Sequence, residues 1–305
     1  MSKKLVCDTG GSKTILEILD EENNVVKKFI DKGFGLASDG LEEILELNNL
    51  LSLIENPNEI KYIVINLGGK NKEQIKNHFQ KVFVNAKINI FRESEGNVSK
   101  ALAKMFNSEV VVLAGTGAIS CGFSGDEKAV VCGGWGMNIS DQGSGYYIGM
   151  EAIKQSLLEL DGSKQLSLLT KTLTGQNEPL SCVTDINIIA EVRDSVRKKL
   201  YPLSRENIAK HAKTTLECAQ KGDKVSIDIL GLAGAELGKL AVRTAEKLSL
   251  KKLNGVVFTG GIINSKKFIE KSLEKEIYKV YGQVKITYLT DGVIEGIRYI
   301  AKKAN

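Results

Sequence analysis

The sequence predicts an α/β protein made of two similar halves around a cleft, each with the element order βββαβαβα and the second with a helical insertion. Short β-rich runs alternate with longer segments whose apolar residues recur at helical spacing. The order of the first third then recurs in the rest of the chain. At roughly 100–200 residues per domain, 305 residues allow two domains with sizeable cores.

In the first half, three short runs rich in β-branched residues predict a three-stranded meander. A capping signal and apolar residues spaced by three or four then indicate a helix. The expected elements are strands at residues 4–8, 14–19 and 24–30, a helix at about 41–54, a strand at 62–67, a helix at 72–82, a strand at 88–91 and a helix at 97–106.

The second half repeats this order and adds helices. The expected elements are strands at 110–114, 119–123 and 129–132, a helix opening near Ser144, helices at 185–200, 204–220 and 225–248, a strand at 255–259, a helix at 266–279, a strand at 284–289 and a helix at 293–302. Topology places the domain boundary so that residues 1–114 and 115–305 form the two domains. The helix at about 293–303 is expected to pack back on the first domain. A single larger α/β domain is the alternative.

Composition excludes several classes of protein. The chain carries 42 Lys and Arg against 37 Asp and Glu without a basic stripe, and aromatic residues make up 6%, so nucleic-acid binding has little support. No apolar stretch is long enough to span a membrane, and no secretory signal is recognisable. The five cysteines contain no CxxC, which favours reduced thiols. We therefore expect a cytoplasmic protein that binds neither membrane nor nucleic acid.

Three glycine-containing turns follow strands, and the first two lie at equivalent places in the two halves. Glycine lets the backbone approach a phosphate closely, and N–H groups with Ser, Thr and Lys side chains can bind its oxygens. Asp8, at the end of the first strand, suits a divalent metal. The turns comprise Gly10, Gly11, Ser12, Lys13 and Thr14; then Gly115, Thr116 and Gly117; and finally Gly260 and Gly261. Any one of them alone is more often just a turn, but the pair of hairpin turns makes a two-sided phosphate clamp plausible.

Residues 132–149, CGGWGMNISDQGSGYYIG, carry the most specific motif. This string and the three turns resemble the actin-like ATPase superfamily of sugar kinases and heat-shock-type ATPases, and more narrowly the N-acetylglucosamine kinase group of the BadF/BadG/BcrA/BcrD ATPase family. The resemblance implies a duplicated ribonuclease H-like fold and covers nearly the whole chain. Residues 161–185 match least.

The resemblance implies phosphoryl transfer from ATP to a hydroxyl of an amino sugar, N-acetylglucosamine or glucosamine. The first turn would hold the β- and γ-phosphates with Mg²⁺ near Asp8, the second would face them, and the third would border the adenosine. Homodimerisation is expected from the resemblance alone. The equivalents of five residues bind sugar in the family: Thr116, Cys132, Gly134, Asp141 and Gly145.

The catalytic base of the family is an Asp, and this chain has Glu93 in that position. Ile119 and Gln142 also depart from the family pattern, which leaves the identity of the sugar open. Trp135 is expected to be a packing anchor rather than a platform for a sugar ring. Two other functions remain: a partner-coupled ATPase, although Cys121 and Cys132 do not occupy activator-like positions, and a sensor that has lost catalysis.

Overall fold

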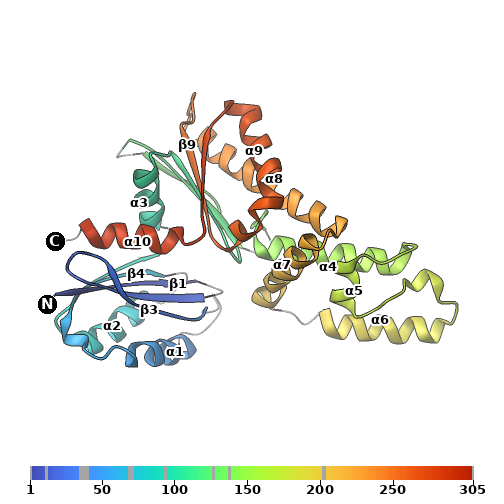
Figure 1. The fold of residues 1–305 in the computed structure, drawn as a ribbon, viewed down its shortest axis with the longest axis horizontal. Helices are drawn as coiled ribbons and strands as arrows, with labels where there is room; N and C mark the ends of the chain where they lie inside the picture. The colour runs from blue at the N-terminus through green and yellow to red at the C-terminus, as the bar shows by residue number, and fades with distance from the viewer. Residues whose placement is uncertain are drawn as a thin grey trace.

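Two five-stranded mixed sheets with helices packed on their faces form the body of the protein (Figure 1). The structure is a computed structural model. It describes residues 2–10, 13–33, 41–67, 72–92, 95–125, 128–136, 139–200 and 204–303, with the side chains of all of these except 41–46. Each predicted strand and helix of the two halves is present.

The first sheet has the strand order β3-β2-β1-β4-β5. Strand β1 pairs antiparallel with β2 and parallel with β4. The sheet comprises β1 (Lys3–Thr9), β2 (Lys13–Leu19), β3 (Val25–Lys32), β4 (Ile60–Leu67) and β5 (Lys87–Arg92). Because successive side chains of a strand point to opposite faces, Leu5 and Cys7 pack in the core under α1 (Leu41–Ser52) and α2 (Lys72–Val82), whereas Val6 packs on the other face.

The second sheet has the order β10-β9-β6-β7-β8, which is the same spatial order counted from its own first strand. The pairing directions also repeat, antiparallel for β6 with β7 and parallel for β6 with β9. The strands are β6 (Val110–Ala114), β7 (Ala118–Ser124), β8 (Lys128–Gly133), β9 (Gly255–Thr259) and β10 (Lys285–Leu289). The predicted duplication is confirmed. Strand β6, placed in the first domain by a boundary at residue 114, is the central strand of this second sheet.

Helices of the second half cover one face of its sheet and extend beyond it (Figure 1). They are α4 (Gly145–Gly162), α5 (Leu168–Thr174), α6 (Ile186–Leu200), α7 (Arg205–Gln220), α8 (Lys224–Lys247) and α9 (Lys266–Tyr281), and 3₁₀ turns lie at η1 (Pro57–Glu59), η3 (Leu180–Cys182) and η4 (Gly261–Ser265). The sequence did not predict α5, which lies between residues 161 and 185. No helix in the described residues combines the length and apolarity needed to cross a bilayer.

Two helices lie between the sheets, and each also packs on the sheet of the other half. Helix α3 (Asn97–Phe106) precedes the second sheet and packs on its strands, whereas α10 (Gly292–Lys303) follows that sheet and packs on β1 and β4 of the first. The two helices also contact each other, as Figure 1 shows. One apolar core therefore contains Val64 of the first sheet, Val111 of the second, Leu102 of α3 and Ile297 of α10.

Candidate functional site

Asp8 lies at the end of β1, where its carboxylate meets Asn66 of the neighbouring β4. The Asn66 amide donates to Asp8 Oδ1 at 3.0 Å. Burial raises the pKa of Asp8 to about 6, while the Asn66 hydrogen bond and the Lys13 charge act in the opposite direction. Asn66 is itself buried, and its Oδ1 has no hydrogen-bond partner among the described residues. Asp8 and Asn66 thus present two oxygens at one place that a cation would stabilise. Sequence reasoning missed Asn66, although a polar residue at the end of an apolar strand was a signal.

The hairpin after β1 brings the first glycine turn close to the second half of the protein. The two halves are called the first and second lobe below. Gly10 N–H donates to the Lys13 carbonyl at 3.0 Å and closes the turn. Lys13 Nζ lies 3.5 Å from Asp291 Oδ1, and both side chains are about half exposed. Thr14, in contrast, is fully buried, and its hydroxyl has no partner among the described residues. Gly11 and Ser12 lie outside the described residues.

The second glycine turn holds the N-terminus of α4. Gly145 N–H donates to the Gly115 carbonyl at 2.8 Å, and Tyr146 N–H donates to the Thr116 carbonyl at 3.1 Å. Ser144 caps the same helix by accepting from Tyr147 N–H. These bonds attach the start of α4 directly to the turn. A Cβ on Gly115 would meet no atom within 4 Å, so this part of the turn faces open space.

Asp141 is a buried carboxylate directly beside this turn. It is 2% exposed, and its backbone is left-handed with φ 70°. Its Oδ1 accepts from Ala118 N–H at 3.1 Å, and its Oδ2 accepts from Arg205 Nη2 at 2.8 Å. A Cβ on Gly117 would lie 2.5 Å from Arg205 Nη2, so glycine makes room for the pair. Sequence reasoning missed Arg205, which begins α7 and carries no local signal of this contact.

Other described residues of the 132–149 motif lie at the end of β8 and just after it. Cys132 is partly buried on β8, and Gly134 adopts φ 72° where a Cβ would press on Ile119. Trp135 is 78% exposed, so the expectation that it anchors the packing is wrong. A hollow of about 350 Å³ is lined by residues of this motif and of α4: Ile139, Ser140, Gln142, Tyr146, Tyr147, Met150, Glu151 and Lys154.

The third glycine turn adjoins the second. Gly260 has φ 106°, and a Cβ there would collide with the Ala114 carbonyl at the end of β6. A Cβ on Gly261 would meet nothing within 4 Å. Thr259, directly before them, is fully buried, and the described part of the chain offers its hydroxyl no hydrogen-bond partner. A Cβ on Gly292 would press against Thr259. Close contacts therefore run from one turn to the next, and Asp291, next to Gly292, connects them to Lys13.

The carboxylate expected to act as base, Glu93, lies outside the described residues. Glu95, the other carboxylate of that segment, pairs with Lys72 Nζ at 3.1 Å. The described lining of the hollow of about 350 Å³ includes Gln142 and Tyr146, which follow Asp141 and Gly145 in the sequence, and no residue of the glycine turns.

Two sheets of one repeated topology, each with a glycine turn after its first strand, define an actin-like ATPase fold of the duplicated ribonuclease H-like type. A sequence profile described as the BadF/BadG/BcrA/BcrD ATPase family matches residues 7–295. The chain belongs to this family, and ATP is the nucleotide that the family uses.

The chain is similar to sugar kinases along its whole length. It is 28% identical over 306 residues to an N-acetylmuramic acid/N-acetylglucosamine kinase of Clostridium acetobutylicum, covering 97% of this chain and 96% of the relative. It is 32% identical over 183 residues to an N-acetyl-D-glucosamine kinase of Dictyostelium discoideum, covering 59% of this chain and 55% of the relative. A crystal structure of a candidate N-acetylglucosamine kinase from Porphyromonas gingivalis shares the fold, with a TM-score of 0.72 at 17% identity over 99% of this chain and all of that chain.

Proposed function

We propose that this protein is an ATP-dependent sugar kinase that transfers the γ-phosphoryl group to a hydroxyl of an amino sugar, N-acetylglucosamine or glucosamine. The observation that carries the proposal is the similarity to the clostridial N-acetylmuramic acid/N-acetylglucosamine kinase, which extends over nearly all of both chains. The contacts that connect the three glycine turns add support, because a nucleotide needs phosphate and adenosine contacts from separate segments.

On the nucleotide side, the described residues fit a magnesium–nucleotide complex. Mg²⁺ on a nucleotide is usually held by one or two carboxylates and by phosphates, and when bound it neutralises the charge that develops in phosphoryl transfer. Asp8 would hold the ion, and the unpartnered Asn66 Oδ1 would accept from one of its waters. Lys13 would exchange Asp291 for a phosphate oxygen. Gly115, Thr116 and Gly117 would bind from the second lobe, with Gly260 and Gly261 beside the adenosine.

On the acceptor side, the sugar would lie over the 132–149 motif. Asp141 would accept a sugar hydroxyl, because each carboxylate oxygen has more than one lone pair and here uses one of them. Arg205 would fix the orientation of the carboxylate. Exposed Trp135 is open to a sugar ring, and Thr116, Cys132, Gly134 and Gly145 would complete the site.

The phosphoryl transfer itself requires in-line positioning and a group that accepts the hydroxyl proton. Glu93 would supply that carboxylate, since Glu95 is bound to Lys72. A positioned general base contributes about 10²–10⁴-fold to the rate.

The deciding experiment measures ADP release from Mg²⁺-ATP with N-acetylglucosamine, glucosamine, N-acetylmuramic acid, N-acetylmannosamine and glucose, and with no sugar. Stimulation by one hexosamine is expected. Equal hydrolysis with and without sugar would instead support a partner-coupled ATPase. Sugar binding without turnover would support a sensor.

A further inference from the structure

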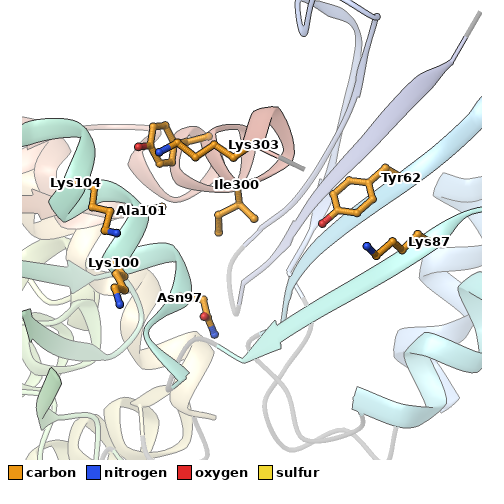
Figure 2. A pocket seen from close by; sticks show the side chains of 9 residues that line it. Tyr62, Lys87, Asn97, Lys100, Ala101, Lys104, Ile300 and Lys303 are labelled. Atoms are coloured by element: carbon orange, nitrogen blue, oxygen red, sulfur yellow. The ribbon is translucent and has the colours of Figure 1, made fainter. Parts of the chain in front are cut away.

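A groove distinct from the glycine turns runs between the first sheet and α3, the helix that covers the second sheet. Its volume is about 500 Å³, within the range of small-molecule sites. The described lining residues are Tyr62, Lys87, Asn97, Lys100, Ala101, Lys104, Tyr299, Ile300 and Lys303. Four of them are lysines and none is acidic. Figure 2 shows these side chains reaching the groove from three sides.

The four lysines come from three elements. Lys87 lies on the edge strand β5, Lys100 and Lys104 on α3, and Lys303 on α10. A last-turn lysine such as Lys104 or Lys303 stabilises its own helix dipole. A lysine on an edge strand hinders strand pairing. Neither of these roles, at a helix end or on an edge strand, explains why the four lysines line the same hollow. Among the described lining residues all charged side chains are positive, and a hollow lined in this way favours anions.

Neutral groups of the groove suit a phosphate as well. The Tyr62 hydroxyl accepts a hydrogen bond from Asn89 Nδ2 at 2.6 Å, so its own proton can be donated to a ligand. Asn97 opens α3, whose first turn contains no acidic residue and whose N-terminal amides favour negative charge. Lys87 Nζ lies over the Tyr62 ring, 6.0 Å from its centroid.

We propose that this groove binds a multiply charged, phosphate-bearing small molecule at a second site, separate from the nucleotide. Lysine ammonium groups bind phosphate as point charges, and several of them can share a ligand with several phosphate oxygens. The anion would touch Lys87 of the first sheet and Lys100 of the helix on the second sheet, so it would join the two lobes. The proposal does not depend on the identity of the sugar or on kinase activity.

The test uses pyrophosphate as the probe, titrated calorimetrically into the full chain with saturating ADP present. The ADP occupies the nucleotide site, so the remaining heat reports a different site. We expect one pyrophosphate per chain. The double variant Lys87→Gln/Lys303→Gln should weaken binding at least tenfold, because two of the four charges are lost. Tyr62→Phe, which keeps the ring and all lysines, should weaken it several-fold.

The matched control is Lys251→Gln/Lys252→Gln, which removes two exposed charges elsewhere on the surface. It should bind pyrophosphate as the wild type does. Equal weakening in the control would show a general effect of net charge and overturn the site. Absence of pyrophosphate binding in the presence of ADP, or full binding in both Lys87→Gln/Lys303→Gln and Tyr62→Phe, would overturn it as well.

Discussion

Asp141 and Arg205 form an ion pair, 2.8 Å from Oδ2 to Nη2, that connects the 132–149 motif to the first turn of α7. The carboxylate is 2% exposed and the Arg205 side chain 15%, so water screens the pair poorly. A helix of the insertion thereby holds the motif residue on which the proposed sugar site depends.

Replacing Arg205 should therefore destabilise the protein far more than breaking a surface pair. Arg205→Ala leaves the buried Asp141 charge with the Ala118 amide alone, and such a change costs about 3–5 kcal/mol. Arg193→Ala breaks an exposed pair with Asp161 and should cost at most about 1 kcal/mol. Urea denaturation of both variants measures the difference. Equal free energies of unfolding would mean that Asp141 does not need its partner.

Asp141→Asn should mainly weaken sugar binding and slow turnover. The amide keeps the size of the side chain, but an NH2 group replaces one of the two oxygens that can accept a hydrogen bond from a sugar hydroxyl. We expect a higher KM for the sugar and a lower kcat, with the KM for ATP nearly unchanged. Asp161→Asn, an exposed carboxylate on α4, is the control. Unchanged kinetics on the true substrate would remove Asp141 from the sugar site.

Glu93→Gln should abolish most of the phosphoryl transfer while leaving ATP binding intact. Loss of a positioned base predicts a fall in kcat of about 10²–10⁴-fold. Glu95→Gln serves as the control, since Glu95 pairs with Lys72. Nucleotide affinity is measured separately by titration. A Glu93→Gln variant that retains most of its kcat would show that another group accepts the proton.

The stability of the ligand-free protein should fall as pH rises through the range set by Asp8. Its pKa of about 6 in the folded state lies above the ordinary value near 3.8, so between these values the folded state holds a proton that the unfolded state has lost. Raising the pH across this window therefore destabilises the fold, and the penalty is complete above about pH 6. Asp8→Asn should be more stable than wild type at pH 7.5 and similar to it below pH 4. Parallel denaturation curves at both pH values would contradict the assignment.

Asp291 should compete with ATP for Lys13. The pair is half exposed and spans 3.5 Å, so its strength is at most about 1 kcal/mol. Asp291→Asn should then lower the KM for ATP by up to about fivefold, the equivalent of that energy. Asp194→Asn, another exposed carboxylate in an ion pair, should leave the KM unchanged. A raised KM in Asp291→Asn would indicate that Asp291 helps to bind the nucleotide.

The fold was largely predictable, because glycine turns and apolar periodicity are local signals that recur in both halves. The missing helix α5 is only seven residues long and too short to show a clear periodicity. The contacts between residues of the site were harder to predict from the sequence. Asp141 and Arg205 are 64 positions apart, and Lys13 meets Asp291 across the two lobes. Trp135 was misjudged because its exposure depends on how the loop leaves β8, which composition does not reveal.

The exchange of helices between the sheets also determines when the first lobe can mature during synthesis. Glu17 of β2 is fully buried against Arg298 of α10, which lies 281 positions later in the chain. At about 5–20 residues per second, the ribosome adds Arg298 on the order of 14 to 56 s after Glu17. Throughout that interval the face of β1 and β4 that α10 covers stays open to solvent or to a chaperone. The first lobe thus keeps an uncovered apolar face until the last helix of the chain has been made.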